Sequence, residues 1–465
     1  MRKGFCLALF VVSIPGLLLG GQEIGAGEAH WPQWRGPLGT GVSVGSKPPV
    51  EWSEDRHVRW KLPLPGVGHS TPVIWGDRVF LTAAIPFGEP VEVSHPEDHG
   101  AHDNVAPSRR LHFAVLAVSR KSGKILWQRI VRSGPPHEAT HTTGSWASAS
   151  PVTDGKLVFA SFGSQGIYAL TVEGKEVWSR DLGDMHIRHS HGEGSSPALH
   201  GNTLVVNWDH QGDSFVVALD KATGKDRWRK PREEITSWSS PVIVEHQGRA
   251  QVVIAATGRV RAYDLESGEV IWQCGGLSRN VVASPVAAEG LVYVTNSYDD
   301  RALLAIRLDK AKGDITGTDA VAWTLKRHTP YVPTPLLYDG RLYFVKHLQS
   351  FLNAVDAETG ASLFGPSRLP VSGMIFASPI GAGGRVYVVG RNGLTTVLEA
   401  SDRFEVLAVN RLNDSFSASP AVAEDELYLR GERHLYCLAT PKATPKAVRG
   451  KAEGERPSAP VIPKE

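Results

Sequence analysis

The segment Gly194–Trp228 reads GSSPALHGNTLVVNWDHQGDSFVVALDKATGKDRW and predicts four short β-strands. Strands are expected at Ser196–Leu199, Thr203–Trp208 and Ser214–Asp220, and a fourth strand ends at Trp228. Val, Leu, Phe and Trp favour strands, and Gly or Asn marks each turn, where a positive φ costs little. A single meander of this size cannot bury both of its faces, so it requires copies of itself as neighbours.

The chain supplies these copies. A Ser/Thr-Pro pair opens each one, with proline at positions 72, 151, 197, 241, 285, 335, 379 and 420, most of them about 44 residues apart. A second signature ends the copy quoted above and recurs around Trp127, Trp178 and Trp272; it reads Ala218-x-Asp220-x-x-Thr223-Gly224-Lys225-x-x-Trp228. This period, with four strands per unit, predicts an all-β β-propeller. We expect the Gly to make a tight turn and the Trp to wedge against the neighbouring blade.

The eighth copy is incomplete, because it ends near Leu438 with no fourth strand and no Trp. A lone strand, Val58–Leu62, stands before the first copy and contains Trp60. Proteins avoid an open ring, since it would leave an unpaired sheet edge. We therefore predict an eight-bladed β-propeller of four-stranded antiparallel blades over residues 31–440, in which this N-terminal strand closes the last blade.

Both ends of the chain differ in composition from the repeats. Residues 1–26 are interpreted as a cleaved signal peptide, because two basic residues precede an apolar run from Phe5 to Leu19 that is short for a membrane span. Cys6 lies inside this run, so we expect no lipid anchor and no stable membrane anchor, and a periplasmic or secreted location. Residues 441–465 are rich in Pro, Lys, Glu and Ala and are expected to be disordered. The net charge of +2 indicates no nucleic-acid partner.

The Ala-x-Asp-x-x-Thr-Gly-Lys-x-x-Trp repeat resembles the tryptophan-docking repeat of the pyrroloquinoline quinone (PQQ) family. That family includes quinoprotein alcohol dehydrogenases and BamB-like outer-membrane assembly proteins. The opening segment Trp31-Pro32-Gln33-Trp34-Arg35-Gly36-Pro37, followed by Gly39-x-Gly41, is similar to secreted BamB-like propellers of planctomycete-type bacteria. The resemblance covers about residues 31–440 and implies the fold, which hosts both enzymes and scaffolds.

Two functions follow from the resemblance. In the family's dehydrogenases, the quinone lies between a Trp and a disulfide of adjacent cysteines, beside a calcium ion held by Glu, Asn and Asp. This chain has neither a Cys-Cys pair nor a Cys-x-x-Cys-His haem site. The sequence therefore favours a monomeric binding or scaffolding module without a cofactor, whose ligand is a protein partner or a small polar molecule. The alternative is a PQQ-dependent oxidoreductase that uses calcium.

A candidate binding surface follows from the expected topology. The innermost strand of a blade starts at the central channel, so the residues just before each Ser/Thr-Pro pair should ring its mouth: His69, Trp146, His191, Glu193, Trp238, Asn280, Tyr331, Phe376 and Phe416. Loops between second and third strands open on the same face and add His95, His99 and His102. This mixture suits a small polar ligand or a peptide. The other interpretation is that these side chains only plug the channel.

A candidate metal site lies within the same set. The spacing His189-x-His191-x-Glu193 alternates, so in an extended segment the three side chains would share one face. Transition metals favour such ligands. The alternative is that they are polar loop residues on an exported protein.

Overall fold

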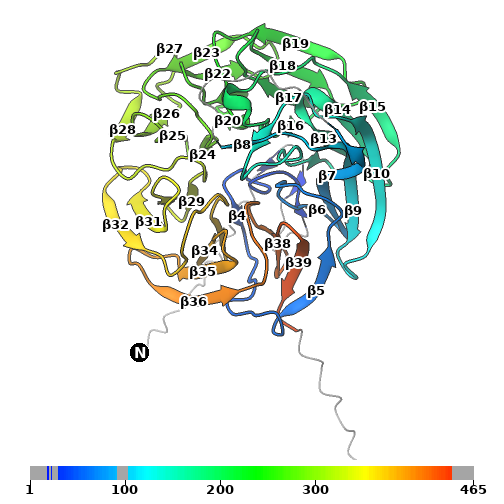
Figure 1. Ribbon diagram of the computed structural model, residues 1–465. Coiled ribbons are helices and arrows are strands. Elements are labelled where there is room, and N and C mark those ends of the chain that lie inside the picture. Colours follow the sequence, from blue (N-terminus) through cyan, green and yellow to red (C-terminus); the bar gives the residue numbers. More distant parts are fainter. Residues whose placement is uncertain (1–17, 20–21, 24–29, 92–102, 442–465) are drawn as a thin grey trace, which may run out of the picture.

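The computed structural model describes residues 18–19, 22–23, 30–91 and 103–441, within which eight β-sheets form a ring around a central axis (Figure 1). Each blade is an antiparallel meander whose strands follow one another outward from the axis. The helices of the described residues are two 3-10 turns, η1 (Gly163–Gln165) and η2 (Arg188–Ser190). The predicted all-β, eight-bladed propeller is confirmed.

The first four blades have the following strands, from the axis outward. Blade 1 contains β6 (Val73–Trp75), β7 (Arg78–Pro90), β9 (Arg109–Ser119) and β10 (Ile125–Gly134). Blade 2 contains β12 (Val152–Thr153), β13 (Leu157–Ser161), β14 (Ile167–Thr171) and β15 (Glu176–Arg180). Blade 3 contains β16 (Ala198–His200), β17 (Thr203–Trp208), β18 (Phe215–Asp220) and β19 (Asp226–Pro231). Blade 4 contains β20 (Val242–His246), β21 (Arg249–Ile254), β22 (Val260–Asp264) and β23 (Val270–Cys274).

The other four blades repeat the pattern. Blade 5 contains β24 (Val286–Ala288), β25 (Leu291–Asn296), β26 (Ala302–Arg307) and β28 (Val321–Leu325). Blade 6 contains β29 (Leu336–Tyr338), β30 (Arg341–Val345), β31 (Phe351–Asp356) and β32 (Ser362–Arg368). Blade 7 contains β33 (Ile380–Ala382), β34 (Arg385–Val389), β35 (Leu394–Glu399) and β36 (Val406–Arg411). Blade 8 contains β37 (Ala421–Ala423), β38 (Glu426–Arg430), β39 (His434–Ala439) and β5 (Val58–Pro63).

Short strands lie outside this pattern. β1 (Leu18–Leu19) pairs with β2 (Gln22–Glu23), and β8 (Asn104–Val105) pairs with β11 (Thr140–His141). β3 (His30–Trp31) extends blade 1 beside β6, β4 (Val42–Ser43) runs parallel to β33, and β27 (Gly313–Asp314) runs parallel to β23.

The N-terminal strand closes the ring, as the incomplete eighth copy predicts. β5 pairs with β39 in antiparallel register, with Trp60 opposite Cys437 and Leu62 opposite Leu435. Blade 8 is therefore built from both ends of the repeat region. Bringing together residues far apart in sequence has an entropic cost, and in return β5 pairs with the outer edge of β39, which would otherwise be exposed.

The Ser/Thr-Pro pairs form a hydrogen-bonded inner ring. For seven of the eight, from Thr71 to Ser378, the backbone N–H donates to the side-chain hydroxyl of the counterpart in the next blade, over distances between 2.8 and 3.0 Å. The ring runs through Thr71, Ser150, Ser196, Ser240, Ser284, Thr334, Ser378 and Ser419. These polar groups are buried, and the ring satisfies backbone donors that no strand ladder serves.

The Gly and Trp of the second signature meet across blade boundaries. Trp178 of blade 2 lies on Gly224 of blade 3, where a Cβ would stand 2.7 Å from the indole ring, and its Nε1 donates to Lys221 O at 2.9 Å. Gly224 also has φ +68°, so the turn and the contact both require glycine. The same contact joins Trp60 to Gly123, Trp127 to Gly174, Trp228 to Gly268 and Trp323 to Gly360. The predicted wedge is confirmed.

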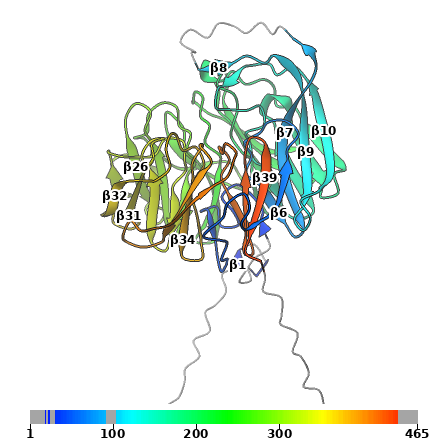
Figure 2. The same ribbon diagram turned by 60° about the horizontal axis from the view of Figure 1, so that its bottom comes forward.

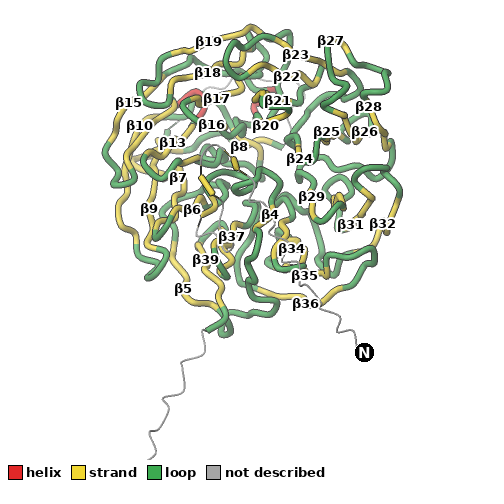
Figure 3. The backbone as a smooth tube through the Cα atoms, turned by 180° about the vertical axis from the view of Figure 1, so that it is seen from behind, coloured by secondary structure: helices red, strands yellow, loops and turns green. Residues whose placement is uncertain are grey.

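The segment between β3 and β5 ties several blades together. Trp31 is fully buried in β3, and Trp52 packs in the same core cluster with residues of blades 7 and 8. The Arg35 guanidinium, also buried, donates to Pro379 O at 2.7 Å, to Thr40 O at 3.0 Å and to Pro335 O at 3.1 Å. Figure 3 shows from behind that β4 lies close to the axis. The segment therefore links blades 1, 6, 7 and 8.

The two faces of the ring differ. β8 stands at the top of Figure 2 and β1 at the bottom, so the insertion of blade 1 and the N-terminal strands lie on opposite faces. His95, His99 and His102 lie outside the described residues, as do most of the predicted signal peptide and nearly all of the predicted disordered tail. Within the described residues, no helix has the length and apolar character needed to cross a membrane.

Candidate functional site

A cavity opens among blades 1, 2 and 3. Its volume is about 740 Å³, taken out to its open mouth. Its wall comes from β9, the linker between β10 and β11, the loop between β11 and β12, η1, the loop between β15 and β16, the end of β17 and the loop before β20. Since His141 of β11 donates its backbone N–H to His191 O at 3.1 Å, this loop layer belongs to the face that carries β8.

Three of the nine side chains predicted at the channel mouth line this cavity: Trp146, Glu193 and Trp238. The indole N–H of Trp146 donates to Glu138 O at 2.9 Å, and that of Trp238 donates to Gly192 O at 2.7 Å. Because both N–H groups are used, these side chains offer mainly their ring surfaces to a ligand.

Glu193 is held at one end of the cavity with 16% of its side chain exposed. The Ser164 N–H donates to its Oε2 at 2.8 Å, and the Ser164 hydroxyl donates to its Oε1. A Cβ at Gly163 would lie 1.4 Å from Oε2, so glycine is required for the carboxylate to approach the η1 backbone. Burial raises the pKa of Glu193 to about 7, although both Ser164 bonds favour the ionised form.

Glu138 is a second carboxylate of the cavity, which the sequence analysis missed. The Ile187 N–H lies 3.2 and 3.1 Å from its two carboxylate oxygens, and His186 Nδ1 lies 3.3 Å from Oε1. Burial raises its pKa. His137 Nε2 donates to Met185 O at 2.7 Å and lies 4.0 Å from Oε1 of Glu138 and 3.8 Å from Oε1 of Glu193. The carboxylates of Glu138 and Glu193 and the imidazole of His137 therefore lie close together.

No repeat position marks Glu138. It lies in the long linker after β10, and its approach to Glu193 depends on how this linker packs against η1 and the loop before η2. The signal in the sequence is only that His137 and Glu138 are adjacent polar residues directly after a Pro-Pro pair.

The His191 side chain lies outside the cavity lining. Its ring packs against His141, with centroids 4.7 Å apart, and lies 5.4 Å from the ring of His189. Gly192, the residue that separates it from Glu193, does line the cavity. The His191 ring and the Glu193 carboxylate therefore have different surroundings.

The remaining predicted mouth residues have separate environments. His69 is half-buried, and burial together with the charges of Arg430 and Arg391 lowers its pKa to about 3. Tyr331 stacks on His347 with ring centroids 5.0 Å apart. Phe416 belongs to blade 8 and packs on Tyr436. Asn280 belongs to blade 5 and is 3% exposed. Phe376 belongs to blade 7 and lies under the Arg391 guanidinium.

The geometry assumed for the metal site is wrong. Residues 188–190 form the η2 turn, in which His189 has φ +56°, so the segment is not extended and its side chains do not alternate as in a strand. Glu193 is bonded to Ser164 instead of facing His189. Among the residues that the structure describes, no group of three or more His, Cys, Asp or Glu is placed to hold a metal ion.

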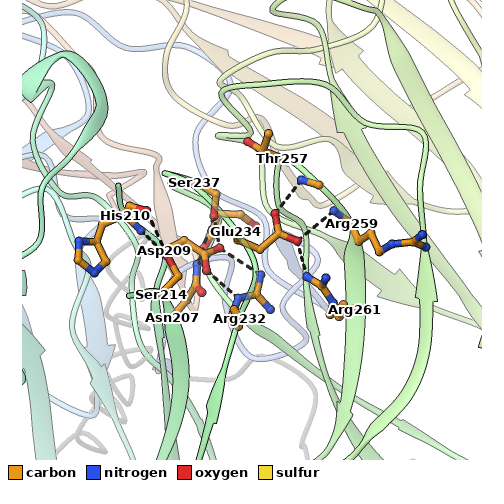
Figure 4. A network of polar contacts seen from close by, with 12 residues as sticks. Asn207, Asp209, His210, Ser214, Arg232, Glu234, Ser237, Thr257, Arg259 and Arg261 are labelled. Carbon is orange, nitrogen blue, oxygen red and sulfur yellow. Dashed lines mark hydrogen bonds and ion pairs between the residues drawn. The ribbon is translucent and has the colours of Figure 1, made fainter. Parts of the chain in front are cut away.

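A buried polar network supports the cavity wall from blades 3 and 4 (Figure 4). Asp209, which lines the cavity, accepts from Arg232 Nε at 2.6 Å and Nη2 at 3.1 Å, and neither side chain is exposed. Ser237 Oγ donates to Asp209 at 2.6 Å. Nearby Glu234 accepts from Arg261 and from the Gly258 N–H. The network thereby anchors the residue that precedes Trp238.

We expect Glu193→Gln to stabilise the protein above pH 7. The carboxyl has a folded pKa of about 7 against an ordinary value of 4.5, so the folded chain holds a proton that the unfolded chain releases between these values. Its contribution to stability therefore falls as pH rises from about 4.5 to about 7 and remains low above that. The variant should melt about 2–4 °C higher at pH 8 and show a smaller gain at pH 5.

Calorimetric melting at both pH values tests this prediction. Asp184→Asn, which removes an exposed carboxylate from the same loop, should show no such dependence on pH. An equal loss of melting temperature for Glu193→Gln at both pH values would instead show that the carboxylate is a structural tie.

Comparison with known proteins agrees with this architecture. BamB of Yersinia pestis, an outer membrane protein assembly factor, is 21% identical over 331 residues, which cover 68% of this chain and 77% of that protein. The solved structure of BamB from Moraxella catarrhalis superposes with a TM-score of 0.51 at 13% identity, covering 77% of this chain and 99% of that chain. A europium-containing methanol dehydrogenase gives a TM-score of 0.60 at 9% identity, covering 89% and 98%.

At these identities, the two solved structures establish a shared fold and nothing more. A family model described as outer membrane protein assembly factor BamB matches residues 42–207 and 212–364. Because these two ranges together span more than half of the 465 residues, the chain belongs to the BamB family.

Proposed function

We propose that this chain is a periplasmic or secreted binding module, monomeric and without a cofactor, that holds a protein partner or a small polar ligand in the cavity among blades 1, 2 and 3. The observation that carries the proposal is the meeting of Glu138 and Glu193 with the rings of Trp146 and Trp238 in one open cavity. Flat apolar walls with a few converging polar groups are the usual composition of a ligand site.

Three further points support a binding role. Burial raises the pKa of Glu193, so keeping its carboxylate ionised inside the protein costs free energy. A residue that only stabilised the fold would not need to be ionisable. The cavity lies in loops between blades, while the blades themselves form a rigid ring. Relatives in the same family are named assembly factors, which fits a module that binds other proteins.

Site-specific photo-crosslinking tests this function. His186, with 69% of its side chain exposed beside Glu138, would be replaced by a photoreactive amino acid in the full chain. The control position is Val177 on the outer strand of blade 2, 46% exposed. We expect a defined adduct from position 186 in envelope extract and none from position 177. Equal labelling at both positions, or none at either, would contradict a partner at the cavity.

The alternative function is a quinone-dependent oxidoreductase, and we expect it to fail in titration. The two cysteines beyond residue 6, Cys274 and Cys437, are buried in different blades, 4 and 8. They therefore do not form the disulfide of adjacent cysteines that the resemblance implies for a quinone site. The acidic side chains of the described residues also supply no group of three that could hold calcium. PQQ and calcium should give no saturable heat or spectral change. Micromolar binding with dehydrogenase activity on an alcohol or a sugar would overturn the binding-module proposal.

A further inference from the structure

The polar groups of the cavity have more acceptors than donors. Glu138 and Glu193 both line it, and each presents a carboxylate whose internal partners are few: Ile187 N–H and His186 for Glu138, and Ser164 for Glu193. A carboxylate has about four acceptor positions, so each retains capacity toward the cavity. A ligand that offers only acceptors would leave this capacity unused.

Most of the side-chain donors that line the cavity are already engaged. The hydroxyls of Ser148, Ser195 and Ser237 donate to Ser145 O at 2.8 Å, Ser239 O at 3.0 Å and Asp209 Oδ2 at 2.6 Å. His137 Nε2 and both indole N–H groups donate to backbone carbonyls, as described above. Apart from the Gln165 amide, the Ser161 hydroxyl and the Trp208 indole, the lining side chains therefore have little left to donate to an anion or to a carbonyl group.

Asn207 adds an independent observation. It lines the cavity and is only 3% exposed. Its Nδ2 donates to Asp209, Ser237 and Ser239, but its Oδ1 accepts no hydrogen bond. A buried oxygen without a donor is unfavourable, so a donor from a bound molecule would relieve this cost.

The aromatic walls complete the chemistry. Trp146 and Trp238 present their ring surfaces, and Phe113, Phe162 and Trp208 also line the cavity. Aromatic faces attract cations and accommodate apolar chains. Arg232 is paired with Asp209, to which Asn207 also donates, and so adds no net positive charge.

We infer that the cavity binds a cation, an ammonium or guanidinium group carried on an apolar stem, with its head at Glu138, Glu193 and Asn207 and its stem between Trp146 and Trp238. This inference rests on the proposed function and specifies its ligand class. The cation comes from a free amine or from a basic side chain of a partner polypeptide; both sources share the same head group.

Binding should strengthen as pH rises from 6 to 8. The titratable groups that face the head-group position are Glu193 and Glu138, His137 from the linker after β10 and His186 from the loop after β15. Ionisation of the two carboxylates, whose pKa values burial raises, favours a cation. Because Glu193 has a pKa of about 7, a bound cation should also release protons into the buffer.

Isothermal titration of the full chain with benzylamine tests the inference, with benzyl alcohol as the neutral ligand of similar shape. We expect benzylamine to bind at least tenfold more tightly than benzyl alcohol at pH 8, and at least fivefold more tightly at pH 8 than at pH 6. Glu193→Gln should weaken benzylamine at least tenfold and leave benzyl alcohol unchanged. Glu138→Gln serves as a second variant, and Asp184→Asn should change neither affinity.

Competition identifies the source of the cation. A blocked Ala-Lys-Ala peptide that displaces benzylamine, where Ala-Met-Ala does not, indicates a basic side chain; benzylamine binding without displacement indicates a free amine. Equal affinity for benzylamine and benzyl alcohol, an unchanged affinity in Glu193→Gln, or no saturable heat with benzylamine would overturn the inference. A specific adduct from position 186 alongside any of these results would leave the proposed binding function standing with a neutral ligand.

Discussion

Removal of residues 31–64 is expected to abolish cooperative unfolding of the propeller. The deletion takes away β5 and so leaves β39 as a free edge, and it removes the pairing of β4 with β33. It also removes Trp31 and Trp52 from the core cluster shared by blades 1, 7 and 8. A ring depends on each blade having two neighbours, so opening it at blade 8 exposes apolar surface on both sides of the break. Thermal denaturation followed by circular dichroism and by calorimetry measures this effect.

A point variant separates closure from packing in this experiment. Arg35→Met removes the donors to Pro379 O, Thr40 O and Pro335 O but retains β5, so the ring remains closed. We expect it to lose about 2–3 kcal/mol of stability, because buried carbonyl groups lose their donors, while unfolding stays cooperative. A truncated chain that melts like the full-length protein would refute the role assigned to β5.

Replacement of Arg232 by methionine should destabilise the protein by about 3–5 kcal/mol, because it leaves the Asp209 carboxylate buried without a counter-charge. Neither side chain of this pair is exposed, and the guanidinium also donates to Tyr263 OH at 2.6 Å. Urea unfolding at pH 7 gives the change in free energy. Since Ser237 donates to Asp209, the fluorescence of Trp238 should also change.

The double variant Arg232→Met with Asp209→Leu tests the cause. A buried ion pair replaced on both sides by apolar groups often has a stability close to the original, so the double variant should recover most of the loss. If it is as unstable as Arg232→Met alone, packing of the arginine stem, and not the unpaired charge, explains the loss.

The sequence by itself determined the fold, because the contacts that build the ring repeat with the chain. Trp178 and Gly224 are the Trp and the Gly of the same signature in two successive copies, and the contact between them joins neighbouring blades. From Ser150 to Ser419, each hydroxyl of the inner ring likewise accepts from the backbone N–H of the preceding copy, so the regular spacing of the Ser/Thr-Pro pairs indicates the architecture. The missing fourth strand after Leu438 likewise predicted closure by Val58–Leu62, and β5 pairs there with β39.

The composition of the cavity was decided only by the tertiary structure. Trp146, Glu193 and Trp238 could be named from their places before the Ser/Thr-Pro pairs, but Glu138 lies in a linker without a counterpart in other copies. The η2 turn, with His189 in a left-handed conformation, likewise breaks the alternation on which the predicted metal site depended. Strand pairing is periodic and can be read from spacing, whereas the path of an irregular loop depends on non-repeating contacts with the neighbouring blades, such as that of Ile187 with Glu138.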